Sequence, residues 1–215
     1  MADLQPIYYR FLRRLDILET VFVNWTKAKP SNLRDEDLMF LEGMVSSLWQ
    51  HWSLFCRRVI FSYALGCTTR TGNEIPSSVT PRTWERVSYI AWRANSGGSI
   101  QPMILNTILR KEPTWGDVEK MQTIVRILIP SNAGHLVSCF GSVFHGPKHL
   151  QIVRNAASHR NFQTFNDVKK LRNYYNSKPM RHPAEVVIWT EPISNGFVFM
   201  DWAEEIRILS DMITR

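Results

Sequence analysis

Apolar residues recur every three or four positions over long stretches, and this spacing constrains the fold more than any other feature of the chain. Between residues 35 and 64 the repeat runs without interruption through Leu38, Leu41, Val45, Leu48, Trp52, Phe55 and Val59. Such a repeat forms one apolar stripe along an α-helix, and the stripe must pack against other helices. A second stripe covers residues 4–22 and ends before a Lys-Pro-Ser-Asn break at 29–32. The pattern predicts a mainly α-helical, antiparallel bundle.

Further helices are expected after a loop rich in Thr, Ser, Gly and Pro at residues 66–80. They are predicted near residues 82–94, 102–110, 114–129, within 134–159 with a break near Gly146-Pro147, and at 164–176. The end of the chain differs, because two β-rich runs, 186–190 and 197–201, flank the turn signal Asn195-Gly196. We therefore expect a helical bundle over residues 1–180. A small C-terminal β-hairpin and helix over 181–215 would be packed on it.

Composition excludes several classes of protein. With 44% hydrophobic and 21% charged residues, the chain can bury a core and is not a disordered tail. Cys56, Cys67 and Cys139 have no close pairing, which excludes a disulfide scaffold and a cysteine-rich zinc site and fits a reducing compartment. No signal peptide or membrane-spanning stretch is apparent. The expectation is a cytoplasmic protein with no membrane partner and no cofactor.

The positive charge is concentrated in one segment. The formal net charge is +7, and residues 145–182 contain eight Lys or Arg against a single acid, Asp167, so this segment accounts for all of it. Phe162, Phe165, Tyr174 and Tyr175 lie in the same segment. Basic groups interleaved with aromatic rings suit a phosphate backbone and stackable bases, which favours a nucleic-acid partner.

Within this segment, residues 150–159 divide cleanly on a helical wheel. The apolar half holds Leu150, Ile152, Val153, Ala156 and Ala157, and the polar half holds Gln151, Arg154, Asn155, Ser158 and His159. An imidazole can act as a general acid or base near neutral pH, and a guanidinium can stabilise charge on a phosphate. Asn155 lies four residues before His159 and is therefore its neighbour on the helix. This set suits phosphodiester chemistry and demands no metal.

The hexapeptide from Arg154 to His159 resembles the R-x4–6-H motif of the HEPN superfamily, in the form where a polar residue, often Asn, follows the Arg. The resemblance covers residues 33–176. It implies a helical-bundle, metal-independent endoribonuclease of the kind found in toxin–antitoxin and antiviral defence systems. It assigns His159 as general acid/base, Arg154 as stabiliser of the phosphate and transition state, and Asn155 as an auxiliary residue. The RNA 2′-hydroxyl would attack the adjacent phosphate and leave a 2′,3′-cyclic phosphate.

A homodimer is expected on two grounds. In-line displacement needs a base and an acid on opposite sides of phosphorus, and one helix supplies a single His, so two copies across a two-fold axis would supply both. The resemblance implies the same composite site, together with an antitoxin or defence-system partner protein. The residues expected to bind RNA around the site are Lys148, Gln151, Ser158, Arg160, Lys169, Lys170 and Arg172.

Other interpretations remain open at this point. The chain could be a catalytically inactive HEPN-like module that binds RNA or a nucleotide, or a helical interaction protein whose basic face docks an acidic partner. A metal site is disfavoured, because His145 and His149 have zinc-ligand spacing but Gly146-Pro147 intervenes and no further ligand is near.

Overall fold

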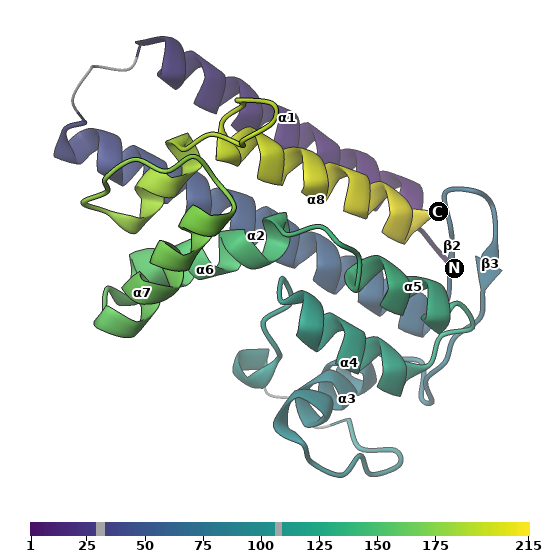
Figure 1. Cartoon of the computed structure of the whole chain (residues 1–215). Coiled ribbons are helices and arrows are strands. Elements are labelled where there is room, and N and C mark those ends of the chain that lie inside the picture. Colours follow the sequence, from purple (N-terminus) through teal and green to yellow (C-terminus); the bar gives the residue numbers. More distant parts are fainter. Residues whose placement is uncertain (29–32, 106–108) are drawn as a thin grey trace. The chain divides into compact units, whose positions relative to one another are not determined.

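The computed structural model describes residues 1–28, 33–105 and 109–215 and confirms a mainly helical chain (Figure 1). The predicted break at 29–32 and part of the short helix predicted at 102–110 lie outside the described residues. The α-helices are α1 (Leu4–Ala28), α2 (Asp35–Leu65), α3 (Trp84–Ser96), α4 (Val118–Leu128), α5 (Ala133–Phe140), α6 (Gly146–His159), α7 (Phe162–Lys170) and α8 (Val198–Thr214). Short 3-10 helices are η1 (Leu109–Lys111), η2 (Leu171–Asn173) and η3 (Pro183–Ile188).

Helix α2 carries the predicted apolar stripe. Its first turn holds Asp35, Glu36 and Asp37, and carboxylates are favoured there by the helix dipole. Every stripe residue from Leu41 to Val59 is buried, and only Leu38, in the first turn, is half-buried. The prediction for this helix is therefore confirmed along its length.

The described chain forms two compact units, each assembled from separate stretches. Unit 1 comprises Met1–Phe11, Trp52–Val143 and Ile208–Arg215, and unit 2 comprises Leu12–His51 and Phe144–Arg207. Helices α1, α2 and α8 contribute residues to both units. Residues 181–215 are likewise distributed over both, and the division expected at residue 180 stays a prediction.

Unit 1 contains a partly buried cluster of polar side chains around Glu112. Arg57 of α2 donates two hydrogen bonds to the Glu112 carboxylate, at 2.7 and 2.9 Å. The same carboxylate accepts hydrogen bonds from Ser88 of α3 at 2.6 Å and from the Trp115 indole at 2.8 Å. Four donors therefore satisfy one carboxylate, which ties α2, α3 and the segment before α4 together.

Unit 2 contains the basic segment together with parts of α1, α2 and α8. Phe22 of α1 stacks on Phe199 of α8 with ring centroids 4.5 Å apart, and Figure 1 shows α8 running beside α1. Arg207 of α8 pairs with Glu19 of α1 at 2.8 Å. Helices α6 and α7 complete this unit.

Strands lie where the sequence did not predict them. Within unit 1, β1 (Ala2–Asp3) pairs in parallel with β2 (Cys67–Thr68), and β2 pairs antiparallel with β3 (Glu74–Ile75), in the register Cys67 to Ile75. Residues 66–80, expected to be a loop, thus include a short hairpin.

The prediction of a C-terminal β-hairpin is wrong, because the two β-rich runs do not form a pair of strands. Pro183–Ile188 form η3, α8 begins at Val198, and the two β-rich runs meet only at an isolated bridge between Thr190 and Phe197. The physical reason is tertiary packing: all six residues of η3 are buried, and Phe199 lies in the core with the rest of α8. Burial in a helical surrounding overrides β-propensity.

Candidate functional site on helix α6

Helix α6 is positioned at its first residue by α8. The backbone N–H of Gly146 donates to the Glu205 carboxylate. A Cβ at Gly146 would lie only 3.1 Å from the Cα of Trp202, so the missing side chain allows this close approach. Pro147 follows in the first turn, where a missing N–H is tolerated. The predicted break near Gly146-Pro147 is thereby confirmed as the start of a new helix.

The other end of α6 is set by a sharp change of direction. Arg160 adopts a left-handed conformation with φ 31°, and its N–H donates to the Ala156 carbonyl. Asn161 then caps α7, because its side chain accepts the Thr164 N–H at 3.0 Å and its own N–H donates to the Thr164 hydroxyl at 3.3 Å. His159 is consequently the last residue of α6, directly before this corner.

The predicted division of α6 into two faces is confirmed. Leu150, Val153, Ala156 and Ala157 are buried, and Ile152 is half-buried at the edge of the apolar face. On the polar face Gln151, Arg154 and Asn155 are half-buried, whereas Ser158 and His159 are exposed.

The structure brings two of the three predicted catalytic residues into direct contact. Arg154 donates a hydrogen bond from Nη1 to Asn155 Oδ1 at 3.1 Å, which orients the guanidinium on the polar face. Among the described residues, no hydrogen bond or ion pair joins His159 to either of them. The imidazole is thus exposed one helical turn beyond Asn155, where it is accessible to a ligand.

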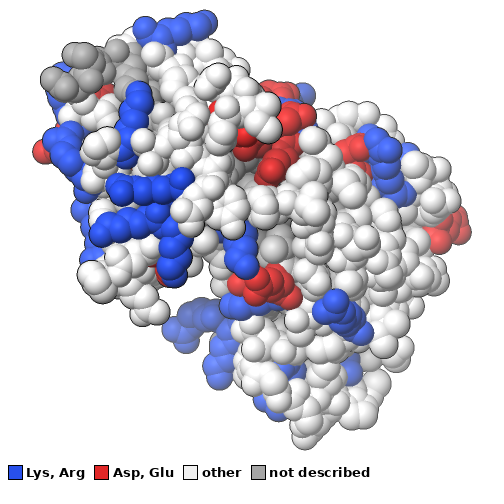
Figure 2. Space-filling view, viewed as in Figure 1, with Lys and Arg blue, Asp and Glu red and all other residues white. Residues whose placement is uncertain are grey.

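The surrounding basic residues differ in how they are held. Arg160 pairs with Glu42 of α2 at 3.0 Å, and Lys170 pairs with Asp167 at 2.7 Å. The Lys169 ammonium lies 5.0 Å from the centroid of the Phe165 ring. Lys148 and Arg172, also predicted to bind RNA, are exposed. Figure 2 shows Lys and Arg side chains gathered over the surface formed by α6, α7 and the residues that follow.

Sequence reasoning missed Glu42. This carboxylate comes from α2, 118 residues before its partner Arg160, and its Oε2 atom also lies 3.5 Å from His182 Nε2. No local spacing signals such a long-range approach. The acid reduces the positive charge at the end of α6 nearest to α2.

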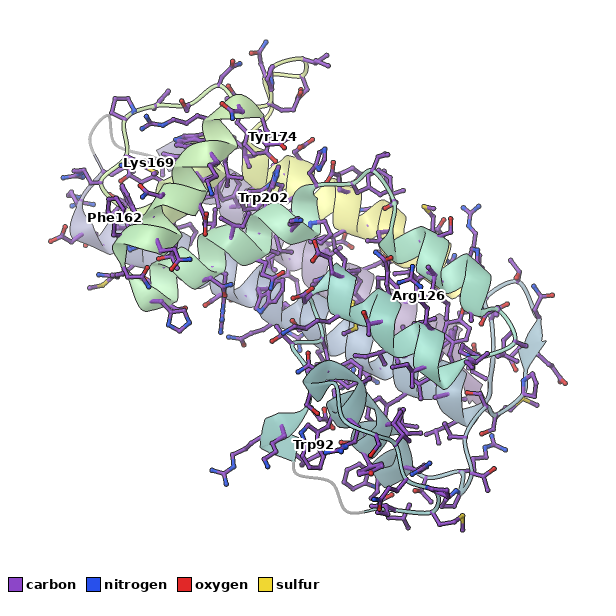
Figure 3. The ribbon with its side chains drawn as sticks, turned by 60° about the horizontal axis from the view of Figure 1, so that its bottom comes forward. Trp92, Arg126, Phe162, Lys169, Tyr174 and Trp202 are labelled. Atoms are coloured by element: carbon purple, nitrogen blue, oxygen red, sulfur yellow. The ribbon has the colours of Figure 1, made fainter. Side chains whose placement is uncertain are left out.

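The first turn of α6 rests on a buried hydrogen-bond chain. The Trp202 indole N–H donates to the Tyr175 hydroxyl at 2.8 Å, and this hydroxyl lies 2.7 Å from His149 Nδ1. Because an indole can only donate, Tyr175 accepts there and has its own proton to give to His149. Burial, together with the nearby charges of His145 and Lys148, lowers the pKa of His149 to about 4. Trp202 is labelled in Figure 3.

This network makes His149 a structural residue. Its ring stacks on His145, with centroids 5.3 Å apart and planes 13° apart, and its Nδ1 is already occupied by Tyr175. In the described part of the chain, no group of three or more His, Cys, Asp or Glu side chains is placed to hold a metal ion. Over the same residues, no helix is both long and apolar enough to cross a membrane.

Comparisons with protein-family models, with curated proteins and with solved structures found no match.

Proposed function

We propose that the chain is a metal-independent endoribonuclease of the HEPN type whose site lies on the polar face of α6. The observation that carries this proposal is the arrangement on one helix: an exposed imidazole at its last residue, His159, and a guanidinium, Arg154, oriented by the hydrogen bond that it donates to the adjacent Asn155. The basic surface around α6 supports an anionic substrate.

The proposed reaction is an internal phosphoryl transfer. The 2′-hydroxyl oxygen of RNA forms a bond to the adjacent phosphorus, its proton passes to a base, and the bond from phosphorus to the 5′-oxygen breaks as an acid protonates that oxygen. The products are a 2′,3′-cyclic phosphate and a 5′-hydroxyl end. Arg154 stabilises the charge that accumulates on the phosphate oxygens, and His159 exchanges the proton.

A homodimer completes this site. The base and the acid act on opposite sides of phosphorus, and α6 offers one exposed imidazole, so the second would come from another copy related by a two-fold axis. We place the protein in the cytoplasm, which the free, buried Cys56, Cys67 and Cys139 support. A role in antiviral defence or toxin–antitoxin growth arrest, restrained by a partner protein, belongs to the same proposal.

Cleavage of single-stranded RNA in excess EDTA tests the proposal. The wild-type protein should cleave and leave 2′,3′-cyclic phosphate ends detectable by mass spectrometry. His159→Ala and Arg154→Ala should each reduce the rate by about 100-fold or more. His135→Ala, which removes another exposed imidazole on α5, is the matched control and should cleave normally.

Four outcomes would contradict it in whole or in part. Equal cleavage by wild type and His159→Ala would show that α6 is not the site, and full inhibition by EDTA would show that a metal is required. RNA binding without cleavage would instead favour the inactive RNA-binding module. A solution mass of one protomer for an active enzyme would contradict the composite site.

A further inference from the structure

A pocket lies directly beyond the candidate site. It has a volume of about 330 Å³ and is lined by Arg160, Phe162 and Phe165 at the corner between α6 and α7, and by Arg181 and His182 before η3. This volume is within the range of sites that hold small ligands. Because Arg160 follows His159 in the chain, the pocket adjoins the residue proposed to move the proton.

Two aromatic rings form one wall of this pocket. Phe162 is 82% exposed, which is unusual for so large an apolar side chain, and Phe165 is half-buried. The Lys169 ammonium lies 5.0 Å from the centroid of the Phe165 ring. Figure 3 shows Phe162 and Lys169 on α7. An exposed phenyl ring beside cationic groups is the usual platform on which an unpaired base stacks.

His182, at the edge of the same pocket, has a buried ring. It is only 8% exposed, and its Nδ1 accepts the Ala184 N–H at 3.1 Å. The neutral ring must therefore carry its proton on Nε2. This atom is itself buried and lies 3.5 Å from Glu42 Oε2, so it is not open to a ligand in the pocket. His182 thus forms part of the pocket lining and keeps Glu42 close to it.

Two arginines of the pocket lining, Arg160 and Arg181, favour an anionic group. Arg160 donates hydrogen bonds from Nε to the Ala157 carbonyl and from Nη2 to Glu42. Arg181 donates from Nη2 to the Leu33 carbonyl at 2.6 Å. Since a guanidinium has five N–H donors, each arginine retains donors for phosphate oxygens.

Acids limit this attraction. Glu42 pairs with Arg160, and the buried Glu185 accepts the backbone N–H groups of Arg181 and His182, at 2.7 Å each. These carboxylates would repel several phosphates placed together in the pocket. A single nucleotide, with one phosphate and a large uncharged ring, would be repelled less.

We propose that this pocket receives one unstacked base of a single-stranded RNA. The base lies against Phe162 and Phe165, while its phosphate lies against Arg160 and Arg181. This inference rests on the proposed function for the nature of the polymer. The pocket would then determine which nucleotide flanks the cleaved bond.

Binding of a fluorescein-labelled single-stranded oligoribonucleotide, measured by anisotropy in a His159→Ala background, tests the inference without cleavage. Adding Phe162→Ala should weaken binding by about tenfold, because stacking on one aromatic ring is lost. The matched control is Ile193→Ala, which removes an equally exposed apolar side chain, 92% exposed, elsewhere in unit 2. It should leave the affinity unchanged. The same RNA in a duplex should bind equally to all three proteins, because its bases are stacked.

The results separate this inference from the proposed function. Unchanged single-strand binding by Phe162→Ala overturns the pocket, even if cleavage still depends on His159. Weakened binding by Phe162→Ala with unchanged binding by Ile193→Ala supports the pocket, even if wild type fails to cleave. Loss of duplex and single-strand binding to the same extent, or binding of polyglutamate with no binding of RNA, also overturns it.

Discussion

Acidification should destabilise the fold through His149, which lies beneath the first turn of α6. Above pH 6.5 the imidazole is neutral in both the folded and the unfolded chain. Burial lowers its folded-state pKa from 6.5 to about 4. Between these values the unfolded chain binds a proton that the folded chain does not, so the free energy of unfolding falls as the pH falls. This difference in pKa lowers the free energy of unfolding by about 3 kcal/mol by the time the pH reaches 4.

The variant His149→Asn isolates this contribution. Asparagine offers an oxygen to the Tyr175 hydroxyl in place of Nδ1 but does not titrate. Urea unfolding followed by tryptophan fluorescence at pH 7 and pH 4 would give the free energy of unfolding of both proteins. The variant is expected to be less stable at pH 7, because the smaller side chain leaves a cavity. The advantage of the wild type should shrink by about 3 kcal/mol at pH 4.

A difference between wild type and variant that stays constant from pH 7 to pH 4 would refute this reasoning. Other groups, such as His182 with its lowered pKa, also reduce stability at low pH. Their effect is common to both proteins and cancels in the comparison. NMR titration of the His149 ring provides an independent check. A midpoint near 6.5 in the folded protein would contradict the buried, neutral imidazole.

Three further substitutions test the packing around the two units by urea unfolding. Tyr175→Phe should lower the free energy of unfolding by about 2–4 kcal/mol, because the Trp202 indole and an imidazole nitrogen lose their shared partner. Gly146→Ala should cost about 1–3 kcal/mol, since its Cβ would meet the backbone of α8, and a result equal to wild type would show that α6 can shift freely. Arg57→Met should cost about 2 kcal/mol by leaving the buried Glu112 carboxylate without its cation; a neutral effect would mean that the remaining donors suffice.

The parts of the fold that depend on local periodicity were predictable. The two faces of α6 follow from a repeat of about 3.6 residues, and the structure buries Leu150, Val153 and Ala156 as that repeat requires. The start of the helix also carries a local signal in Gly146-Pro147. Contacts between distant segments have no such signal. Glu42 approaches the end of α6 only because α2 packs there, and the aromatic pocket depends on Arg181 and His182 returning to α7.

The failure of the C-terminal hairpin has a specific cause. The run Val186–Thr190 is β-rich, but the residues at and before its start carry helix-start signals. Pro183 occupies the first turn, and His182 and Glu185 form a reciprocal capping box. The second run, from Phe197, leads without a break into the apolar spacing of α8. Capping and periodicity both outweighed β-propensity here.

The contacts beneath α6 also impose an order of assembly during protein synthesis. Gly146 depends on Glu205 for its N–H acceptor, and the chain from His149 through Tyr175 ends at Trp202. All of α8 is translated after α6, and a nascent chain folds as its segments emerge. While a ribosome is still making residues 160–197, the first turn of α6 lacks its contacts with Glu205 and Trp202. The helix that carries the proposed catalytic residues therefore gains the support of α8 only after that later segment is made.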